Sequence, residues 1–259
     1  MSYRLKNTVA AVSAAFCLGV GSTAAHGVEI FWTDWTGTDL DTGSGFRAQG
    51  SITTGSTSLT VTYTNPNGVG FYQPSGGIDY YVNGTAATSP FTSSAVDNRP
   101  TGTDIVALQF AGTQTLRFSQ AIANPVFAYV SLNGNGYAFD RDFEILSFGD
   151  PSNGNVCGYW GCGTSFKSVV DLGGGNFEYR LLGTGEPHGT LRFLGSFDTV
   201  SWRSLSNEFW NGFTVGVQGT AAEVFTPVPG IPEPETYALM LAGLGMVGLM
   251  ARCRKRITA

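Results

Sequence analysis

Charge is scarce in this chain, and histidine is scarcer still. Charged residues make up 13% of the 259 residues, about half the usual fraction, and the two histidines are His26 and His188. A metal site built from several histidines is therefore excluded. The sequence has neither the Gly-x-Ser-x-Gly nucleophile elbow nor the His-Glu-x-x-His zinc motif. A Ser-His-Asp triad on His188 stays open, although Glu186-Pro187-His188-Gly189 is typical of a turn. We expect no catalytic residues, no cofactor and no enzyme.

Cysteine is also rare, and its four positions divide into two pairs. Cys17 and Cys253 lie near the ends, whereas Cys157 and Cys162 enclose the short stretch Gly-Tyr-Trp-Gly. Zinc would need further ligands close by, and redox exchange favours the Cys-x-x-Cys spacing. In an oxidising compartment two such cysteines pair, and closing so small a loop contributes roughly 2 kcal/mol. The sequence predicts a structural disulfide between Cys157 and Cys162 and no metal.

Capped amphipathic helices are missing between residues 28 and 226, where apolar residues instead recur with period two. The stretch 126–132 is apolar on both faces, as a central strand would be. We expect 105–110 and 115–118 to form a hairpin, and 177–182, 190–194 and 213–218 to alternate. Further strands are expected at 58–64 and 143–148, separated by Asn- and Gly-rich turns. Roughly ten short strands predict an all-β, two-sheet β-sandwich, jelly-roll-like, with a barrel as the alternative.

The N-terminus has the three parts of a secretory signal peptide. Arg4 and Lys6 provide positive charge, residues 9–20 form a short apolar run, and small residues occupy 21–25. The sequence therefore predicts a signal peptide over residues 1–27, cleaved between Ala25 and Val28. A lipoprotein attached at Cys17 is disfavoured because the apolar run continues past this cysteine.

The C-terminus also has three parts. Residues 227–236 are proline-rich and include the motif Pro232, Glu233 and Pro234; residues 237–251 carry no charge; residues 252–259 are basic. We expect a Pro-rich linker, a transmembrane helix and a cytoplasmic tail. Fifteen helical residues span roughly 22 Å, less than the about 30 Å of a bilayer core, so a plain lasting anchor is the weaker interpretation. The cations expected to stop transfer across the membrane are Arg252, Arg254, Lys255 and Arg256.

This order of parts closely resembles the PEP-CTERM sorting domain of exported proteins. The residues that carry the resemblance are Pro232-Glu233-Pro234, the following Glu235-Thr236-Tyr237-Ala238-Leu239 and the Arg-rich end. The resemblance implies that an exosortase, a membrane-embedded protease, recognises the Pro-Glu-Pro segment and removes the helix during export. It also implies an association with exopolysaccharide. About a tenth of the chain is covered.

The predicted body, residues 28–226, is acidic and faces away from the cytoplasm. It holds eight cations against 17 acids, a net charge of −9, which gives no electrostatic reason to bind nucleic acid. With both terminal signals, we expect export across the inner membrane, transient anchoring there, and final placement on the outer surface or in the extracellular matrix.

Aromatic residues, 13% of the chain, suggest the only binding candidates in the body. Most of them should fill the core, but Tyr159 and Trp160 lie in a Gly-flanked disulfide loop where burial is difficult. The leading hypothesis is a non-enzymatic surface or matrix protein. The alternatives are a carbohydrate-binding module for exopolysaccharide that uses Tyr159 and Trp160, and a glycoside hydrolase with an unrecognised carboxylate pair. Structural calcium at the aspartate clusters stays open; these are Asp34, Asp39, Asp41, Asp140 and Asp142.

Overall fold

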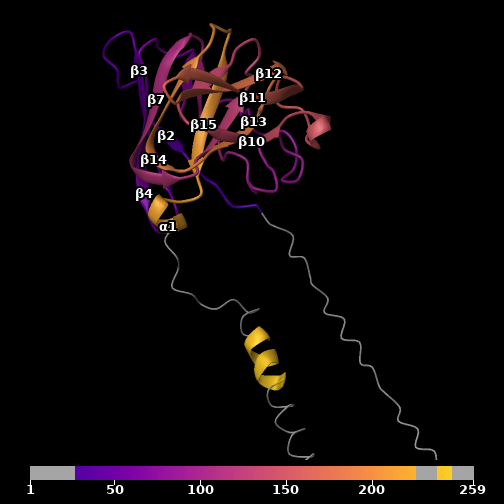
Figure 1. Ribbon diagram of the computed structural model, residues 1–259. Coiled ribbons are helices and arrows are strands. Elements are labelled where there is room, and N and C mark those ends of the chain that lie inside the picture. The colour runs from indigo at the N-terminus through magenta and orange to yellow at the C-terminus, as the bar shows by residue number, and fades with distance from the viewer. Residues whose placement is uncertain (1–26, 226–237, 247–259) are drawn as a thin grey trace, which may run out of the picture.

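Two antiparallel sheets pack face to face in the computed structural model, which describes residues 27–225 and 238–246 (Figure 1). The first sheet has the order β10 (Phe143–Phe148), β13 (Gly189–Phe193), β8 (Val126–Val130), β15 (Asn211–Val217), β6 (Ile105–Leu108) and β5 (Phe71–Gln73), and β1 (Phe31–Trp32) pairs with β15. The second has the order β11 (Gly163–Gly173), β12 (Asn176–Gly185), β9 (Tyr137–Phe139), β14 (Ser196–Ser204), β7 (Gly112–Ala123), β4 (Ser58–Asn65), β3 (Phe46–Thr53) and β2 (Asp34–Thr36).

The strand order is that of a jelly roll. From β6 onward the chain crosses repeatedly between the sheets, so that β13-β8-β15-β6 lies over β12-β9-β14-β7. The predicted all-β, jelly-roll-like sandwich is therefore confirmed. The predicted hairpin of 105–110 with 115–118 is wrong, because β6 belongs to the first sheet and β7 to the second.

Aromatic side chains join the two sheets. Phe127 of β8 and Phe213 of β15 stack with ring centroids 4.9 Å apart and an interplanar angle of 6°. Trp202 of β14 meets both rings edge-on from the opposite sheet, at 5.5 Å and 5.2 Å. Such pairs contribute about 0.5–1.5 kcal/mol each beyond the burial of their area. This core and a second apolar cluster together bury 17 of the 30 aromatic residues that the structure describes, as the sequence predicts.

A second apolar cluster explains a wrong prediction about β15. We expected alternation over 213–218, but every residue of β15 is buried. The segment 74–104 lies over the outer face of the first sheet and contributes Tyr81, Phe91 and Val96 to a cluster with Ile105 and Val130. Both faces of β15 are thus covered, one by the core and the other by this segment. By contrast, β8 is buried at all five residues, as predicted for a central strand.

The body also contains a short helix that the sequence analysis did not predict. Helix α1 (Ala221–Phe225) follows β15, and η1 (Pro151–Asn153) is a single turn of 3-10 helix. Thr220 and Glu223 form a capping box at the start of α1: Glu223 N donates to Thr220 Oγ1 at 3.2 Å, and Thr220 N donates to Glu223 Oε2 at 2.7 Å.

The expected transmembrane helix, 237–251, is described only in part. Residues 238–246 are helical, and their leucines and methionines are exposed. Among the helices in the described ranges, none combines the length and the apolar character needed to cross a membrane. The predicted signal peptide, the Pro-Glu-Pro motif and the cations at 252–256 lie outside the described residues.

Candidate functional site

The register of the first sheet brings three chain segments together at one end of the sandwich. Gly189 pairs with Tyr129, and Gly212 pairs with Val130. The loop that follows β8 therefore lies beside the residues that precede β13 and β15. Together with the disulfide loop, these segments line a hollow of about 280 Å³, the aromatic hollow, whose residues are Ser131, Asn133, Trp160, Glu186, Phe209 and Trp210.

Glu186 is the polar centre of the aromatic hollow. Its carboxylate accepts hydrogen bonds from Ser131 Oγ, at 2.7 Å, and from Asn133 Nδ2. Ser131 is buried and has a φ of 55°, in the left-handed region that non-glycine residues seldom adopt. Such conformations cost roughly 1–3 kcal/mol and gather at functional sites. The chain therefore holds Glu186 in place at a local cost in backbone energy.

Aromatic rings form the walls of the hollow. Trp160 is 53% exposed and Phe209 86% exposed, whereas Trp210 is half-buried. Trp210 lies edge-on to Trp160, with centroids 6.3 Å apart, and at 5.0 Å to Tyr80 behind it. Tyr159 packs against both Tyr80, at 5.2 Å, and Trp160, at 4.9 Å. Each contacting pair of rings is edge-on, with interplanar angles of 64° to 79°, so the rings build a corner and not a flat platform.

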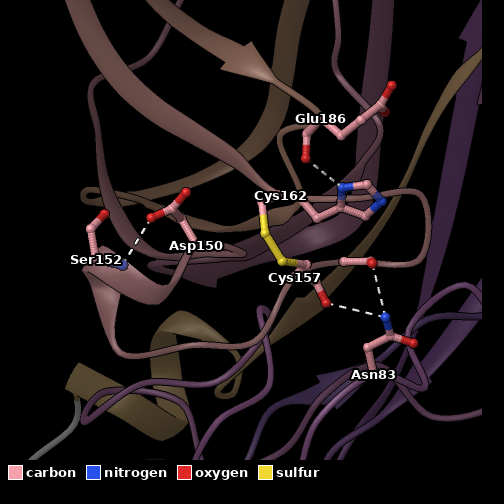
Figure 2. The surroundings of a disulfide bond; sticks show 8 residues. Asn83, Asp150, Ser152, Cys157, Cys162 and Glu186 are labelled. Carbon is pink, nitrogen blue, oxygen red and sulfur yellow. Dashed lines mark hydrogen bonds between the residues drawn. A yellow bond between two sulfur atoms is a disulfide. The ribbon is translucent and has the colours of Figure 1, made fainter.

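The predicted disulfide between Cys157 and Cys162 is confirmed, and it shapes the loop that carries Trp160 (Figure 2). The two Cα atoms are 4.4 Å apart. Asn83 Nδ2 donates to the carbonyl oxygens of Cys157, at 3.1 Å, and of Gly158, at 2.8 Å. Glu186 N donates to Cys162 O at 2.9 Å. The loop is thus tied to the segment 74–104 on one side and to Glu186 on the other.

His188 lies beneath this loop and outside the hollow. A Cβ atom on Gly158 would overlap its ring, so glycine is needed at 158 for the loop to rest there. His188 Nδ1 bonds to Glu186 O at 2.8 Å, which makes Nδ1 the protonated nitrogen. Nε2 is buried without a hydrogen-bond partner in the described part of the chain. Burial lowers the pKa of His188, so the ring is neutral and supports the loop.

Glu208 is the second carboxyl near the hollow, and it lies behind the lining. Its Oε2 accepts from Asn211 Nδ2 at 2.7 Å, while Oε1 is buried without a partner among the described residues. Burial raises the pKa of Glu208 to about 7; the Asn211 bond opposes this rise, and the negative charge of Glu186 adds to it. Glu208 therefore stays protonated up to about pH 7.

Two of the aspartates in the clusters, Asp39 and Asp140, accept hydrogen bonds from backbone amides. Asp39 Oδ1 accepts from Asp41 N at 2.9 Å and from Arg47 N at 3.0 Å, and Asp140 Oδ1 accepts from Ser201 N at 3.0 Å. Within residues 27–225 and 238–246 there is no group of three or more His, Cys, Asp or Glu residues that could hold a metal ion.

Sequence reasoning identified part of this site. It singled out Tyr159 and Trp160, and the structure places Trp160 in the hollow with Tyr159 beside it. It missed Glu186, Phe209 and Trp210, although Phe209-Trp210 carried a signal. Neighbouring residues at the start of a strand point to opposite faces, so two adjacent large rings cannot both enter one core.

Comparison with known proteins identifies the C-terminus. Residues 230–255 match the family model described as the PEP-CTERM protein-sorting motif. No curated protein and no solved structure matches the chain. The motif implies export, processing by an exosortase and sorting to the cell surface. The chain is thus an exported β-sandwich protein that carries a PEP-CTERM protein-sorting motif at residues 230–255.

Proposed function

We propose that the exported body is a non-enzymatic surface or matrix protein that binds polysaccharide in the aromatic hollow. The observation that carries the proposal is that the exposed rings of Trp160 and Phe209 line one hollow with the hydrogen-bonded carboxylate of Glu186. Sugar rings present apolar C–H faces that stack on aromatic rings and hydroxyl groups that donate to carboxylates. Pre-ordered polar groups within an aromatic wall are typical of small-ligand sites.

The charges near the hollow favour a neutral glycan. Glu186 is a carboxylate, and the body between the terminal signals has a net charge of −9. An acidic polysaccharide would meet like charge at the site and around it, which slows association and weakens binding. We therefore expect neutral segments of an exopolysaccharide to bind better than segments rich in uronic acid.

The position of the hollow supports a role on a surface. It lies at the start of β15, whereas helix α1 follows the end of the same strand. A seven-residue strand separates these points by about 20 Å. While the C-terminal segment is held in the inner membrane, the hollow at the start of β15 lies on the side of the body away from the membrane, where polymer can reach it.

A glycoside hydrolase is the second candidate, because Glu208 has a raised pKa and Glu186 lies near it. Hydrolysis needs two carboxyl groups that both reach the scissile bond. Glu186 lines the hollow, whereas Glu208 is not among its lining residues and keeps one oxygen buried. This arrangement favours binding over hydrolysis.

The test is titration calorimetry on the exported, processed protein, with neutral and uronic-acid oligosaccharides prepared from the host's own polysaccharide. We expect neutral oligosaccharides to bind, and Trp160→Ala to weaken binding about tenfold or more, which corresponds to about 1.4 kcal/mol. Phe225→Ala is the matched control, since Phe225 is an exposed aromatic residue on α1 at the other end of the body. It should bind as the wild type does.

Two results would contradict the proposal. One is wild-type affinity in the Trp160→Ala variant, which would move the binding elsewhere. The other is release of reducing ends that stops in Glu186→Gln, which would make the protein a hydrolase.

A further inference from the structure

One edge of the second sheet is formed by the long strand β11, which in the described part of the chain is paired with a strand on one side only. β11 pairs with β12, and within residues 27–225 it pairs with no other strand. The one backbone hydrogen bond found on its other side joins Gly163 N to Gly149 O, at the first residue of the strand. β10 also contacts β11, but it forms no strand ladder with it. Among the described residues, the backbone groups of 164–172 on that side form no backbone hydrogen bond, which leaves them available to another strand.

Several apolar side chains of β11 are about half exposed to solvent. Phe166, Val169 and Leu172 are exposed to 48%, 51% and 62%. Exposed apolar residues on a long edge strand are a template for pairing with a further strand. Figure 1 shows β11 and β12 on the side of the sandwich that lies away from β3 and β4.

We propose that two copies of this protein pair through β11, antiparallel and centred on Val169. In this register Lys167 of one copy lies opposite Asp171 of the other, and because the arrangement is two-fold symmetric this pair forms twice. Directly opposite charges stabilise a strand pair, and like charges weaken it. Both residues also lie on the same face of β11, as an antiparallel pair requires.

The neighbouring registers that keep the same faces together are less favourable. Centring the pair on Lys167 would place the two lysines opposite each other, and centring it on Asp171 would do the same with two aspartates. Centring on Ser168 or Val170 would leave Lys167 and Asp171 opposite uncharged residues. The sequence of β11 thus selects one symmetric register.

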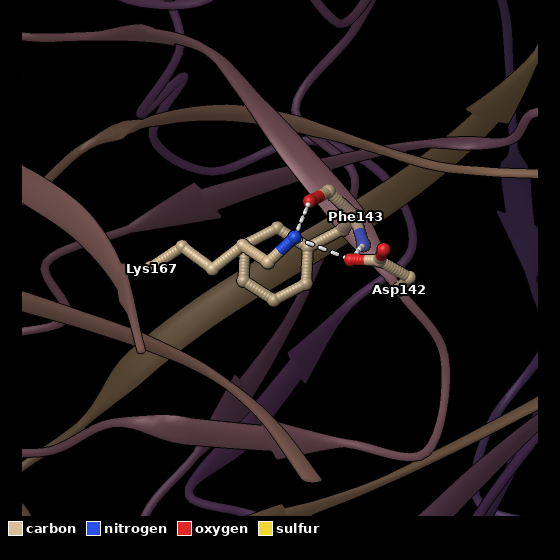
Figure 3. A network of polar contacts seen from close by, with 3 residues as sticks. All are labelled: Asp142, Phe143 and Lys167. Carbon is tan, nitrogen blue, oxygen red and sulfur yellow. Dashed lines mark hydrogen bonds and ion pairs between the residues drawn. The ribbon is translucent and has the colours of Figure 1, made fainter. Parts of the chain in front are cut away.

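Lys167 is positioned for such a contact. Its Nζ donates to Asp142 Oδ1 and, at 2.8 Å, to Phe143 O, and it lies 5.4 Å from the ring centroid of Phe143 (Figure 3). An ammonium group has three N–H donors, so one remains for a carboxylate of the second copy. The side chain stays 30% exposed. Asp171 is exposed on the other half of the strand.

A symmetric pair of this kind closes on itself. Each copy uses the same edge, so the product is a dimer in which one sheet continues across both bodies, and no open fibre forms. The residues that line the aromatic hollow lie outside the 164–172 stretch that pairs, where β8 ends and β13 and β15 begin. The dimer would present two hollows, which raises the apparent affinity for a repeating polymer.

The experiment is sedimentation velocity on the exported, processed protein over a wide range of concentration. We expect the wild type to show a concentration-dependent dimer. Lys167→Asp and Asp171→Lys should each be monomeric, because each places like charges opposite one another. An equimolar mixture of these two variants should recover the dimer, and so should the double variant, because opposite charges then face each other again.

Asp198→Lys is the matched control, since it makes the same charge change at an exposed position of β14. It should dimerise as the wild type does. A monomeric wild type at every concentration overturns the proposal. So does a dimer that survives Asp171→Lys, a substitution at an exposed residue that leaves the Lys167–Asp142 contact intact. Failure of the mixture and the double variant to associate overturns the proposed register.

Discussion

At the residue scale, the burial of Glu208 raises its pKa and makes the stability of the protein depend on pH. One oxygen is bonded to Asn211 and the other is buried without a partner in the described part of the chain. Burial raises the pKa of the carboxyl group above its value in the unfolded chain, so ionisation in the folded protein costs free energy. Because the unfolded chain releases its proton first, this cost appears as the pH rises from about 4.5 to about 7.

Glu208→Gln should therefore stabilise the protein in a pH-dependent way. We expect the free energy of unfolding to rise by about 1–2 kcal/mol at pH 8, less than full linkage would give because the side chain is partly exposed. At pH 4, where Glu208 is protonated in both states, we expect no change. Urea unfolding at the two pH values measures this difference. Glu29→Gln, at an exposed acid, is the control, and an equal effect at both pH values would contradict the assignment.

The site was only partly predictable at this scale. Tyr159 and Trp160 could be found because a disulfide loop closed after four residues leaves little room to bury them. Glu186 and Trp210 could not, because the register of β8 with β13 and β15 brings them to Trp160, and a register is set by pairings distant in sequence. The left-handed conformation of Ser131 likewise has no signature in the sequence.

At the element scale, Glu223 joins α1, at the end of the body, to the turn after β3. We call its hydrogen bonds to Thr54, Ser56 and Thr220 the clasp. Glu223 accepts from Thr54 Oγ1 at 2.7 Å and from Ser56 Oγ, besides its bond from Thr220 N. These bonds lower the pKa of Glu223 to about 2, the Ser56 bond most strongly. The folded-state pKa lies below the unfolded value of 4.5, so this contribution to stability is complete above pH 4.5 and is lost as the pH falls toward 2.

Glu223→Ala should open this clasp while leaving the sandwich folded. Loss of the cap should weaken α1 by about 1 kcal/mol, in the range measured for helix caps. We expect faster hydrogen exchange of the Val224 amide, which donates to Thr220 O at the start of α1, and of the Thr57 amide, which donates to Thr54 Oγ1 within the turn. The core strands should change little. Asp198→Ala serves as a control. Unchanged exchange at both amides would show that the clasp does not hold α1.

The sheets themselves were more predictable than their connections. Alternation over 58–64 located β4, and the apolar run at 126–132 located a central strand, because burial on one face or two leaves a direct pattern. The long strands β3, β11 and β14 were missed. In β3 the inward positions include Ala48 and Gly50, which give a weak hydrophobic signal. The segment 74–104 had no regular pattern, so nothing in the sequence indicated that it would bury the second face of β15.

At the scale of the whole molecule, two ends of the sandwich have separate roles. β1, near the start of the body, pairs with the end of β15 at Gly216 and Val217, and α1 follows that end of β15. The first and the last elements of the body therefore lie at the same end of the sandwich. The aromatic hollow occupies the other end. Six residues lie between Phe225 and the Pro-Glu-Pro motif, so the distance from Phe225 to the motif is at most about 25 Å. The protease must therefore act close to the body and remote from the hollow.

Replacing Pro232-Glu233-Pro234 with alanines should block processing by the exosortase. We expect the variant to keep its C-terminal segment and to remain with the inner membrane, whereas the wild type reaches the surface without it. Intact mass of the recovered protein measures the difference directly. Pro227→Ala, outside the matched motif, is the control. If the alanine variant is released normally, or if surface protein still carries Arg252 to Arg256, the C-terminus is a plain anchor.

The direct connection of β15 to α1 also decides how the body meets mechanical force. A pull on the C-terminal segment acts first on the hydrogen bonds of Glu223, which join α1 to the turn after β3. Beyond α1 the pull runs along β15, between β8 and β6 in the middle of its sheet. The ladder hydrogen bonds lie across that direction, so they resist together and cannot open one at a time. A force applied to the C-terminal segment by the membrane, or to the body by bound polymer, would therefore release α1 and leave the sandwich folded.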